Sequence, residues 1–355
     1  MKGLILSGGR GTRLRPLTYT SAKQLVPVAN KPVLFYGLEA MAEAGIQSVG
    51  IVVGDTQAEI RAAVGDGSRW GLRVEYIEQQ APLGLAHAVL ISEQFIGGEP
   101  FVVYLGDNLL MRGISGLAKE FSRERPAAQI LLARVPDPQM FGVAELSDGR
   151  VVKLVEKPKE PRSDLALVGV YMFSPEVFVS VKRIRPSFRN ELEITDAIQD
   201  LIDRGLDVRP HIVDGWWKDT GKLEDMLEAN RLILDTLERR VEGCVDAASR
   251  VEGKVVVEAG AIIENSVVRG PAIIGARAKI VQAYVGPFTS IMNDVEIRES
   301  EIEHSIVLEG SSVSNLANRI EDSLIGKNVR IFREKMKPSA YRFMLGDNSE
   351  VGIRW

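Results

Sequence analysis

The sequence predicts an α/β domain with a mixed, mainly parallel sheet, followed by a parallel β-helix. Two observations predict this arrangement. Over roughly the first 240 residues, short apolar runs alternate with stretches of helical periodicity, which is typical of α/β proteins. After about Val245 the helical periodicity stops, and short β-branched runs alternate with Gly, Asn, Asp and Glu. We therefore expect three parts, at residues 1–242, 243–333 and 334–355, the last being a capping or assembly tail.

The expected elements of the first part follow one another in chain order. Strands are expected at residues 3–6, 49–53, 73–77, 101–105, 130–135, 143–146, 151–155 and 169–173. Helices are expected at residues 33–44, 57–64, 86–95 and 223–237, and the first of them ends at Gly45. Residues 147–150 predict a hairpin turn, and Asn190 with Glu193 predicts the N-terminal cap of one more helix.

The second part contains an internal repeat of 17 residues. Apolar residues fall at Val251, Val257 and Ile263, then Val268, Ile274 and Ile280, then Val285, Ile291 and Ile297, and continue at Ile302 and Leu308. The register weakens at Ser314 and Arg319 and returns at Ile325 and Ile331. Such hexads predict a β-helix, in which each triple forms one triangular coil with the step residues inward; the alternative is an irregular β-sandwich.

Composition excludes several classes of protein. The chain is 45% apolar and 26% charged with a net charge of −4, so it is globular and has no basic excess for nucleic acid. Three histidines without metal-ligand spacing argue against zinc. The single cysteine, Cys244, excludes an internal disulfide framework, suits a reducing cytoplasm, and is expected to be a small buried residue. No apolar stretch is long enough for a signal peptide or a membrane span.

The most informative motif is a glycine-rich loop at the start of the chain. A short apolar run leads into Ser7-Gly8-Gly9-Arg10-Gly11-Thr12-Arg13, and Arg15 follows. Glycines let the backbone approach a ligand closely, and N–H groups at a turn attract phosphate, so we expect a phosphate-binding loop here rather than an ordinary turn. A Walker loop is excluded because no lysine follows Gly11. A dinucleotide fingerprint is excluded because Leu14 stands at its third glycine position.

Two further motifs carry groups that could act on phosphates. Lys23 and Gln24 offer an ammonium and an amide suited to a base edge, although a lone lysine would ordinarily be a solvated surface charge. Asp107 follows the apolar run 101–105, and the carboxyl ends of strands line the ligand crevice of open α/β sheets. An aspartate there is suited to hold Mg²⁺ bridging phosphates, and the alternative is a turn cap.

Two more motifs extend the candidate site. Glu156 could accept hydrogen bonds from sugar hydroxyls, and Lys157 could pair with a second phosphate. Asp219 is a candidate second Mg²⁺ ligand, and the alternative is that it caps the helix that begins near Leu223. His87, one turn into the helix after Gly84, is expected to be structural or to support a site residue from behind.

These motifs, in this order, resemble the sugar-nucleotide pyrophosphorylases of the sugar nucleotidyltransferase family. The resemblance covers essentially all of the first 230 residues. It also includes Gln79 with Pro82 and Gly84, Phe141-Gly142-Val143, residues 191–195, and Trp217-Lys218-Asp219-Thr220-Gly221. Lys23-Gln24 and residues 191–195 are similar to the thymidylyl branch, in its long form. That form implies a Rossmann-like nucleotidyltransferase domain and a left-handed β-helix. The β-helix replaces the helical C-terminus of the short forms, so their regulatory nucleotide site is not carried over to this chain.

The resemblance implies an activity and a role for each matching residue. It implies Mg²⁺-dependent in-line attack of α-D-glucose 1-phosphate on the α-phosphorus of dTTP, with loss of pyrophosphate. The implied catalytic residues are Arg13, Lys23, Asp107, Lys157 and Asp219, of which Asp107 and Asp219 hold the metal. The implied nucleotide-binding residues are Leu6, Gly8, Gly9, Gly11, Thr12, Arg13, Lys23, Gln24, Gln79, Gly84 and Asp107. The implied sugar-binding residues are Asn108, Gly142, Glu156, Lys157, Leu167 and Val168.

Three alternatives remain open at this point. The first is a related nucleotidyltransferase that uses UTP, GTP, CTP or a modified sugar phosphate. The second is a non-catalytic sugar-nucleotide-binding regulator, which would be marked by loss of Arg13, Lys23, Asp107 or Asp219, all of which are present. The third is acyl transfer on the β-helix, for which His304 is the only candidate histidine. The expected partners are small-molecule substrates and a second copy of the chain, bound through the β-helix and tail.

Overall fold

The computed structural model describes residues 1–9, 11–19 and 21–334, and these form two compact units. The first unit contains residues 1–9, 11, 21–26 and 31–221, and the second contains residues 12–19, 27–30 and 222–334. Most of the expected tail, 334–355, lies outside the described residues. No helix in the described ranges is long and apolar enough to cross a bilayer.

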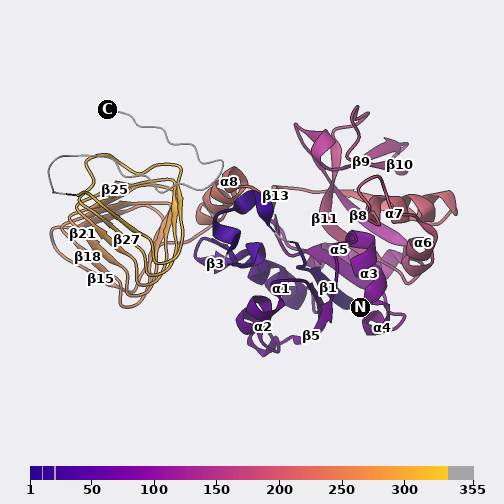
Figure 1. Cartoon of the computed structure of the whole chain (residues 1–355), viewed down its shortest axis with the longest axis horizontal. Helices are drawn as coiled ribbons and strands as arrows, with labels where there is room; N and C mark the ends of the chain where they lie inside the picture. Colours follow the sequence, from indigo (N-terminus) through magenta and orange to yellow (C-terminus); the bar gives the residue numbers. More distant parts are fainter. Residues whose placement is uncertain (10, 20, 335–355) are drawn as a thin grey trace. The chain divides into compact units, whose positions relative to one another are not determined.

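The first unit is built on a nine-stranded mixed sheet (Figure 1). Its main path runs β10-β9-β11-β6-β1-β4-β5, with β8 beside β11 and β12 beside β8. Strand β1 is parallel to β4 and β6, whereas β11 is antiparallel to β6, β8 and β9. The strands are β1 (Lys2–Leu6), β4 (Ser48–Val53), β5 (Arg73–Glu78), β6 (Phe101–Leu105), β8 (Ala128–Arg134), β9 (Gly142–Ser147), β10 (Arg150–Glu156), β11 (Leu165–Phe173) and β12 (Val208–Ile212).

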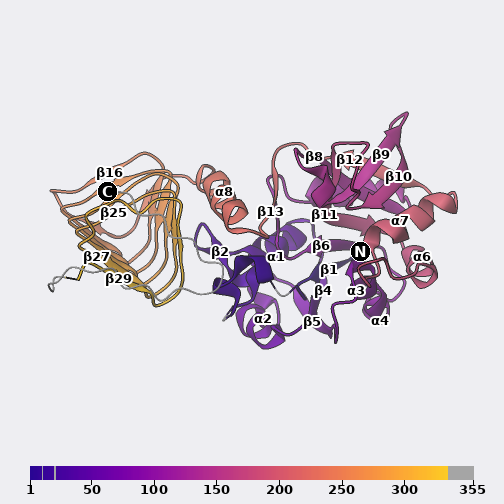
Figure 2. The ribbon, with the colours of Figure 1, turned by 45° about the horizontal axis from the view of Figure 1, so that its top comes forward.

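Helices cover both faces of this sheet (Figures 1 and 2). One face packs on α1 (Val33–Glu43), α2 (Gln57–Val64) and α5 (Ser115–Glu124), and the other on α3 (Leu85–Ile91), α4 (Glu93–Ile96), α6 (Val177–Arg183) and α7 (Ile194–Asp203). Alternation within β1 explains the two layers, because Ile5 belongs to one apolar core and its neighbours Leu4 and Leu6 to the other. Strands that are covered on both faces are almost continuously apolar, and for this reason apolar runs in the sequence predicted their positions.

All eight expected strands are present, and the expected helices need two corrections. The helix expected at 86–95 is broken at Ser92, whose hydroxyl donates to the carbonyl of Ala88 at 2.8 Å, so α3 and α4 are separate. The predicted cap at Asn190 is wrong. Helix α7 begins at Ile194, Asn190 has a φ of 60°, and the carboxylate of Glu193 instead accepts a hydrogen bond from Ser187 at 2.8 Å.

The second unit is a left-handed parallel β-helix made of three sheets. The sheets are ordered β14-β17-β20-β23-β26-β28, β15-β18-β21-β24-β27-β29 and β16-β19-β22-β25. The strands are β14 (Arg240–Val241), β15 (Cys244–Val245), β16 (Arg250–Glu252), β17 (Val255–Val257), β18 (Ile262–Glu264), β19 (Val267–Arg269), β20 (Ala272–Ile274), β21 (Lys279–Val281), β22 (Tyr284–Val285), β23 (Thr289–Ile291), β24 (Glu296–Arg298), β25 (Glu301–Ile302), β26 (Ile306–Val307), β27 (Ser312–Ser314), β28 (Leu324–Ile325) and β29 (Arg330–Phe332). Figure 2 shows the coils stacked on one another.

The strand register confirms the repeat and explains where it weakens. Val251 pairs with Val268, and Val268 with Val285, which is the expected step of one coil. Later, Ile291 pairs with Val307, and Val307 with Ile325, so one coil is a residue shorter and the next a residue longer. Val307 therefore points inward, and the expected step residue Leu308 instead packs against Leu227 of α8 (Leu223–Leu234).

Other parts of the second unit dock on the outside of the coils. The buried side chain of Asn230 on α8 accepts hydrogen bonds from the N–H of Ala29 at 2.9 Å and the hydroxyl of Ser290 at 2.6 Å. Its NH₂ donates to the carbonyl of Phe288 at 3.0 Å. Cys244 is exposed, which contradicts the expected burial, because it lies on the outer side of the first coil.

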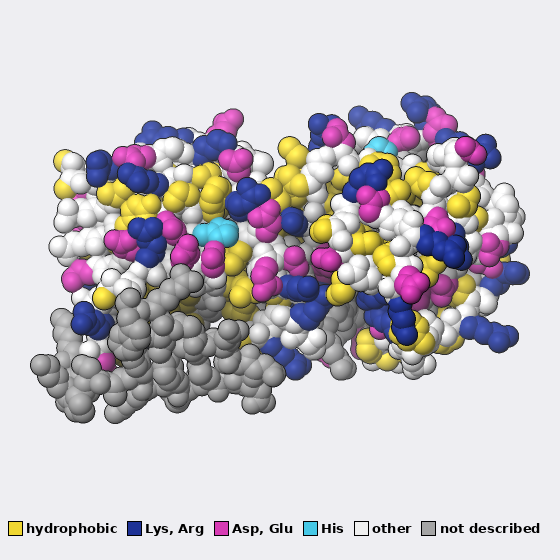
Figure 3. All heavy atoms as spheres, turned by 90° about the horizontal axis from the view of Figure 1, so that it is seen from above, with side chains coloured by type: hydrophobic (Ala, Val, Ile, Leu, Met, Phe, Trp, Pro, Cys, Tyr) yellow, Lys and Arg dark blue, Asp and Glu magenta, His cyan; other side chains and the backbone are white. Residues whose placement is uncertain are grey.

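Ion pairs join neighbouring coils on the surface of the β-helix. Arg277 bonds Asp294 at 2.6 Å, Arg269 bonds Glu252 at 3.0 Å, and Arg319 bonds Glu301 at 2.8 Å. In each pair the partners are about one coil apart in sequence, so side chains of opposite charge lie one above the other. On the face shown in Figure 3, basic and acidic side chains are accordingly interspersed among the described residues.

We expect Ile280→Ala to destabilise the β-helix by about 2–5 kcal/mol, because Ile280 is fully buried and its removal leaves a cavity that the stacked coils cannot close. Denaturant unfolding followed by circular dichroism measures the change. The matched control is Lys279→Ala on the same strand, which is exposed and should shift the free energy of unfolding by about 0.5 kcal/mol or less. Equal effects of the two substitutions would contradict the inward orientation of Ile280.

Candidate functional site

The site begins where three neighbouring parallel strands end. Strands β4, β1 and β6 stop side by side, and the N–H of Ser7 donates to the carbonyl of Val52 at 2.8 Å. The N–H of Gly106 likewise donates to the carbonyl of Leu6 at 2.9 Å. The glycine-rich loop and Asp107 therefore leave the same edge of the sheet, which is the edge where α/β proteins bind ligands.

A cavity of about 220 Å³ opens at this edge. Eight of the expected nucleotide-binding residues line it, namely Leu6, Gly8, Gly9, Lys23, Gln24, Gln79, Gly84 and Asp107. Its remaining lining comes from Val52, Pro82, Leu85, Ala88, Leu105 and Glu191. Residues that are far apart in the sequence thus meet in one place, as the resemblance implies.

The other three expected nucleotide-binding residues do not line this cavity. Gly11 belongs to the first unit but is not part of the lining. Thr12 and Arg13 lie in the short 3₁₀ helix Thr12–Leu14, which belongs to the second unit. Their contact with a triphosphate stays a prediction.

Lys23 lies between the glycine-rich loop and Asp107. Its ammonium forms an ion pair with the Asp107 carboxylate, and both side chains are 14% exposed. A Cβ on Gly9 would lie 3.8 Å from the same ammonium, so Lys23 is also beside the loop backbone. Burial opposes ionisation of Asp107, but the charge of Lys23 and hydrogen bonds from Lys23 and Asn108 outweigh it, so the pKa of Asp107 lies below its usual value.

The second candidate metal ligand is on the adjacent strand. Strand β13 (Trp217–Asp219) is antiparallel to β7 (Asn108–Leu110), with Asp219 opposite Asn108. The N–H and hydroxyl of Thr220 both donate to the carbonyl of Asp107, at 3.0 and 2.8 Å. The N-cap of α8 is Lys222, so the alternative that Asp219 caps this helix is wrong.

The donor set at this place fits Mg²⁺. Within the described residues no group of three or more His, Cys, Asp or Glu side chains could hold a metal, which leaves Asp107 and Asp219 as a pair. Mg²⁺ is usually bound through one or two carboxylates together with substrate phosphates and water. Asp107, just before β7, and Asp219, on the strand paired with β7, offer two carboxylates near the glycine-rich loop, which matches that preference.

Amide groups form the other side of the cavity. Gln24 is 1% exposed, and its amide oxygen is buried without a hydrogen-bond partner among the described residues. A buried acceptor without a partner is costly unless a ligand supplies the donor, and a nucleobase N–H can do so. Gly84 has a φ of 101°, and a Cβ there would overlap the carbonyl oxygen of Leu192, so this turn requires glycine.

The expected sugar-binding residues gather on the antiparallel part of the sheet. Glu156 is opposite Gly142 in the β9–β10 hairpin, and a Cβ on Gly142 would lie 3.2 Å from the Glu156 carboxylate and 3.6 Å from Leu167. Lys157 follows with a φ of 42°, and its ammonium is 3.9 Å from Glu156. The side chain of Val168 is buried in the core on the other face, so only its backbone is available.

Asn108 links Asp107 to Trp217 through hydrogen bonds. It is 2% exposed, and its amide oxygen accepts hydrogen bonds from Trp217 at 2.6 Å and from the N–H of Gly169 at 3.3 Å. Its NH₂ donates to the Asp107 carboxylate at 3.0 Å. Asn108 therefore orients Asp107 and Trp217 in this structure, and its contact with a sugar stays a prediction.

Comparison with known proteins decides the family. A family model described as "Nucleotidyl transferase" matches residues 2–236. The chain belongs to the nucleotidyl transferase family. It is 58% identical to a glucose-1-phosphate thymidylyltransferase of Streptomyces griseus over 99% of both chains, and 57% identical to one of Streptomyces antibioticus over 100% of both. A solved structure of a putative glucose-1-phosphate thymidylyltransferase from Bacillus anthracis is similar with a TM-score of 0.62 and 35% identity, over 65% of this chain and 94% of that one.

One charged residue of this nucleotidyl transferase site was missed by sequence reasoning. Arg189 donates to Glu156 at 3.4 Å, lies 3.5 Å from Glu193, and donates to Glu191 at 3.2 Å. Its guanidinium thus forms ion pairs with three carboxylates, of which Glu156 is on the sugar side and Glu191 lines the first cavity. Residues 187–193 contain one basic residue, Arg189, and two glutamates, and this pattern could have indicated that Arg189 forms ion pairs.

Glu156, on the sugar side, is a carboxyl group whose pKa is shifted by its surroundings. Burial, followed by the charge of Glu193, raises its pKa above the usual value, although Lys157, Arg189 and a hydrogen bond from Thr195 act in the opposite direction. The ionised form of Glu156 therefore lowers the stability of the folded protein. This is typical of a residue that serves binding rather than stability.

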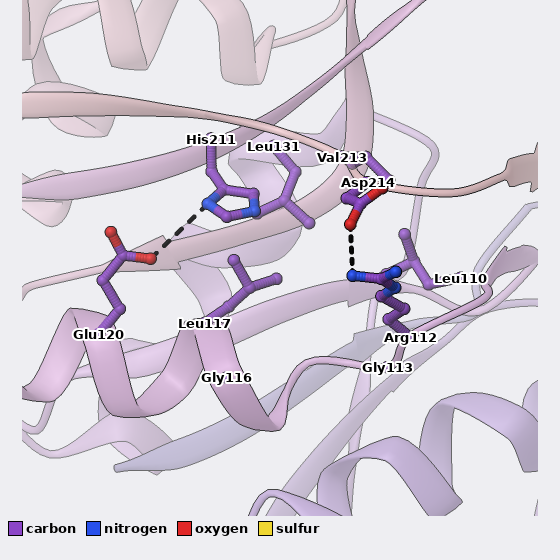
Figure 4. Close-up of a pocket in the computed structure, with 10 residues that line it drawn as sticks. All are labelled: Leu110, Arg112, Gly113, Gly116, Leu117, Glu120, Leu131, His211, Val213 and Asp214. Atoms are coloured by element: carbon purple, nitrogen blue, oxygen red, sulfur yellow. Dashed lines mark ion pairs between the residues drawn. The ribbon is translucent and has the colours of Figure 1, made fainter.

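A second cavity of about 410 Å³ lies beside β7, α5 and β12 (Figure 4). Its floor is apolar, with Leu110, Leu117 and Leu131. Its ionisable side chains lie in pairs, Arg112 beside Asp214 and His211 beside Glu120 at 3.6 Å. None of the expected catalytic, nucleotide-binding or sugar-binding residues lines this cavity.

We expect Glu156→Gln to raise the apparent melting temperature by about 2 °C at pH 8 and to lose this gain near pH 4. The sign follows from the raised pKa. Above the pKa of Glu156 in the folded protein, the ionised carboxylate lowers the free energy of unfolding. Below the pKa of Glu156 in the unfolded chain, the carboxyl group is protonated in both the folded and the unfolded protein, so this loss of stability disappears. Thermal unfolding across this pH range measures the difference. The exposed Glu160→Gln is the control and should show no such trend; a gain that persists at pH 4 would rule out this cause.

Proposed function

We propose that this protein is a glucose-1-phosphate thymidylyltransferase that forms dTDP-glucose and pyrophosphate from dTTP and α-D-glucose 1-phosphate. The observation that carries the proposal is the Lys23–Asp107 ion pair beside Gly9, with Asp219 on the paired strand. Two full-length relatives bear the name glucose-1-phosphate thymidylyltransferase. The buried acceptor of Gln24 supports a base with an N–H donor.

The reaction needs positive charge and alignment rather than a general base. An oxygen of the sugar phosphate attacks the α-phosphorus of dTTP, and the bond to the pyrophosphate oxygen breaks on the opposite side. The nucleophile is already an anion, so no proton has to be removed from it. The barrier comes from repulsion between two polyanions and from charge that develops on the leaving group. Lys23 at the loop and Lys157 at the sugar side are suited to reduce that repulsion, and Arg13 is expected to act on the departing pyrophosphate.

Magnesium is the second part of the proposal. Asp107 and Asp219 would hold it, and the bound ion would neutralise negative charge on the substrate phosphates. Asn108 keeps the Asp107 carboxylate oriented for this role through its hydrogen bond of 3.0 Å. Thr220 fixes the backbone at the same point through two hydrogen bonds to the carbonyl of Asp107.

Pyrophosphate release with a panel of substrates tests the proposed reaction. The panel combines dTTP, UTP, dCTP, CTP and GTP with glucose 1-phosphate and other hexose 1-phosphates, in the presence of Mg²⁺. We expect the highest kcat/KM for dTTP with glucose 1-phosphate. Faster turnover with GTP or CTP would assign the site to a different nucleotidyltransferase, and no release with any pair would favour a non-catalytic binding protein.

We expect Asp107→Asn to lower kcat on the order of 100-fold or more, because the neutral amide removes one metal ligand and the partner of Lys23. Steady-state kinetics with Mg²⁺ as the only metal measure the change, and circular dichroism checks the fold. Binding of Mn²⁺ in the presence of dTTP, followed by electron paramagnetic resonance, should weaken in parallel. Turnover like that of the wild type would remove Asp107 from the metal site.

We further propose that the protein is a homo-oligomer that assembles through the β-helix and the C-terminal tail. The β-helix presents a regular surface, and most of the tail lies outside the described residues. Sedimentation velocity of the full chain should give a mass well above the 39.0 kDa of one chain. A monomeric mass at micromolar concentration would contradict the proposal. The expected cytoplasmic location stays a prediction from cysteine content.

A further inference from the structure

The amide group of Gln79 is held by two hydrogen bonds at the edge of the cavity of about 220 Å³. Because eight of the expected nucleotide-binding residues line this cavity, we call it the nucleotide cavity. Gln79 follows the last residue of β5, and its N–H donates to the carbonyl of Val53 at 2.8 Å. Its side-chain nitrogen lies 3.3 Å from the carbonyl oxygen of Gly84 and 3.0 Å from Nδ1 of His87. A carbonyl oxygen can only accept, so the NH₂ and not the oxygen of the amide faces Gly84.

This orientation determines the state of His87. The NH₂ has two hydrogens, and one of them goes to Gly84, so the other goes to Nδ1 of His87. Nδ1 therefore acts as an acceptor, and the neutral ring carries its hydrogen on Nε2. His87 lies in the first turn of α3, where burial lowers the pKa of the imidazole and the helix N-terminus disfavours a positive charge. The surroundings of His87 thus favour the form that accepts from Gln79.

The oxygen of the same amide faces the glycine-rich loop. A Cβ on Gly8 would lie 3.2 Å from Oε1 of Gln79, and both residues line the nucleotide cavity. Turning the amide by half a rotation would lose both hydrogen bonds and would bring its oxygen against the carbonyl of Gly84. Two acceptors on the protein, the carbonyl of Gly84 and Nδ1 of His87, therefore keep Oε1 directed at the glycine-rich loop.

We propose that His87 is a positioning residue that determines base specificity, because it holds the amide oxygen of Gln79 toward the base. A fixed acceptor favours a pyrimidine with an N–H at ring position 3, as in thymine and uracil, over cytosine, which has a bare nitrogen there. Without His87, only the hydrogen bond to the carbonyl of Gly84 would fix the Gln79 amide, and the second hydrogen of its NH₂ would lose its acceptor. His87 therefore supplies the second constraint on the orientation of the amide. The inference rests on the proposed function, in which Gln79 contacts the base of dTTP.

The test compares His87→Leu with His87→Asn. Leucine removes the acceptor, whereas the side-chain oxygen of asparagine can accept at about the position of Nδ1. For each protein kcat/KM is measured for dTTP with glucose 1-phosphate, and the inhibition constant is measured for dCTP as a competitor. We expect His87→Leu to lower the preference for dTTP over dCTP about fivefold to tenfold, through KM for dTTP rather than kcat. His87→Asn should keep most of the preference.

A double-mutant cycle separates positioning from general damage to the fold. In the background Gln79→Leu, which removes the amide, His87→Leu should cause no further change in the preference between the two bases. A loss that is the same in both backgrounds would overturn the proposal, as would an unchanged preference in the single variant His87→Leu. If His87→Leu melts at a much lower temperature than the wild type, His87→Ala, which also removes the acceptor, replaces it in the same cycle. The outcomes that support or overturn the proposal are then the same.

The wild-type measurement distinguishes failure of the inference from failure of the proposed function. If the wild type releases no pyrophosphate from dTTP and glucose 1-phosphate, the proposed function is wrong, and the inference falls with it. If the wild type is active and prefers dTTP, but the preference does not depend on His87, only the inference is wrong.

Discussion

The ion pair between Lys23 and Asp107 is the interaction on which the site depends. A site for a triphosphate and a sugar phosphate has to hold positive charge where two anions meet, and a free lysine side chain would move with solvent. The Asp107 carboxylate holds the ammonium beside Gly9, and Asn108 in turn holds the carboxylate. Because both charges are mostly buried, their attraction is stronger than it would be in water, and little reorganisation is needed when substrate enters.

The mixed sheet divides the site into two halves with different tasks. The parallel half, β5-β4-β1-β6, supplies the loop, Gln79 and Asp107, all at the carboxyl ends of strands. The antiparallel half supplies Gly142, Glu156 and Lys157 from the β9–β10 hairpin. Strand β11 joins the halves, since it pairs with β6 on one side and with β9 and β8 on the other. The substrates are therefore expected to meet across β11.

Much of the fold could be predicted because its elements carry strong local patterns. The apolar run of β6 and the alternation in the β9–β10 hairpin each reflect one strand and its immediate surroundings. The errors occur where a single side chain, or a change of one residue in the length of a coil, interrupts a local pattern. The hydroxyl of Ser92 donates a hydrogen bond to the carbonyl of Ala88, and α3 ends there. The carboxylate of Glu193 accepts a hydrogen bond from Ser187 and does not form the expected cap. One coil of the β-helix is a residue shorter, so Val307 takes the inward position expected for Leu308.

The sequence by itself determined which residues stand at strand ends, which loop is rich in glycine, and how long one coil of the β-helix is, because these features depend on periodicity and on backbone freedom within a few residues. Only the tertiary structure decided that Lys23 pairs with Asp107, that His87 lies within hydrogen-bond distance of the Gln79 amide, and that Arg189 reaches Glu156. Each of these contacts joins side chains from separate elements, and its geometry follows from how those elements pack, which no local pattern of residues specifies.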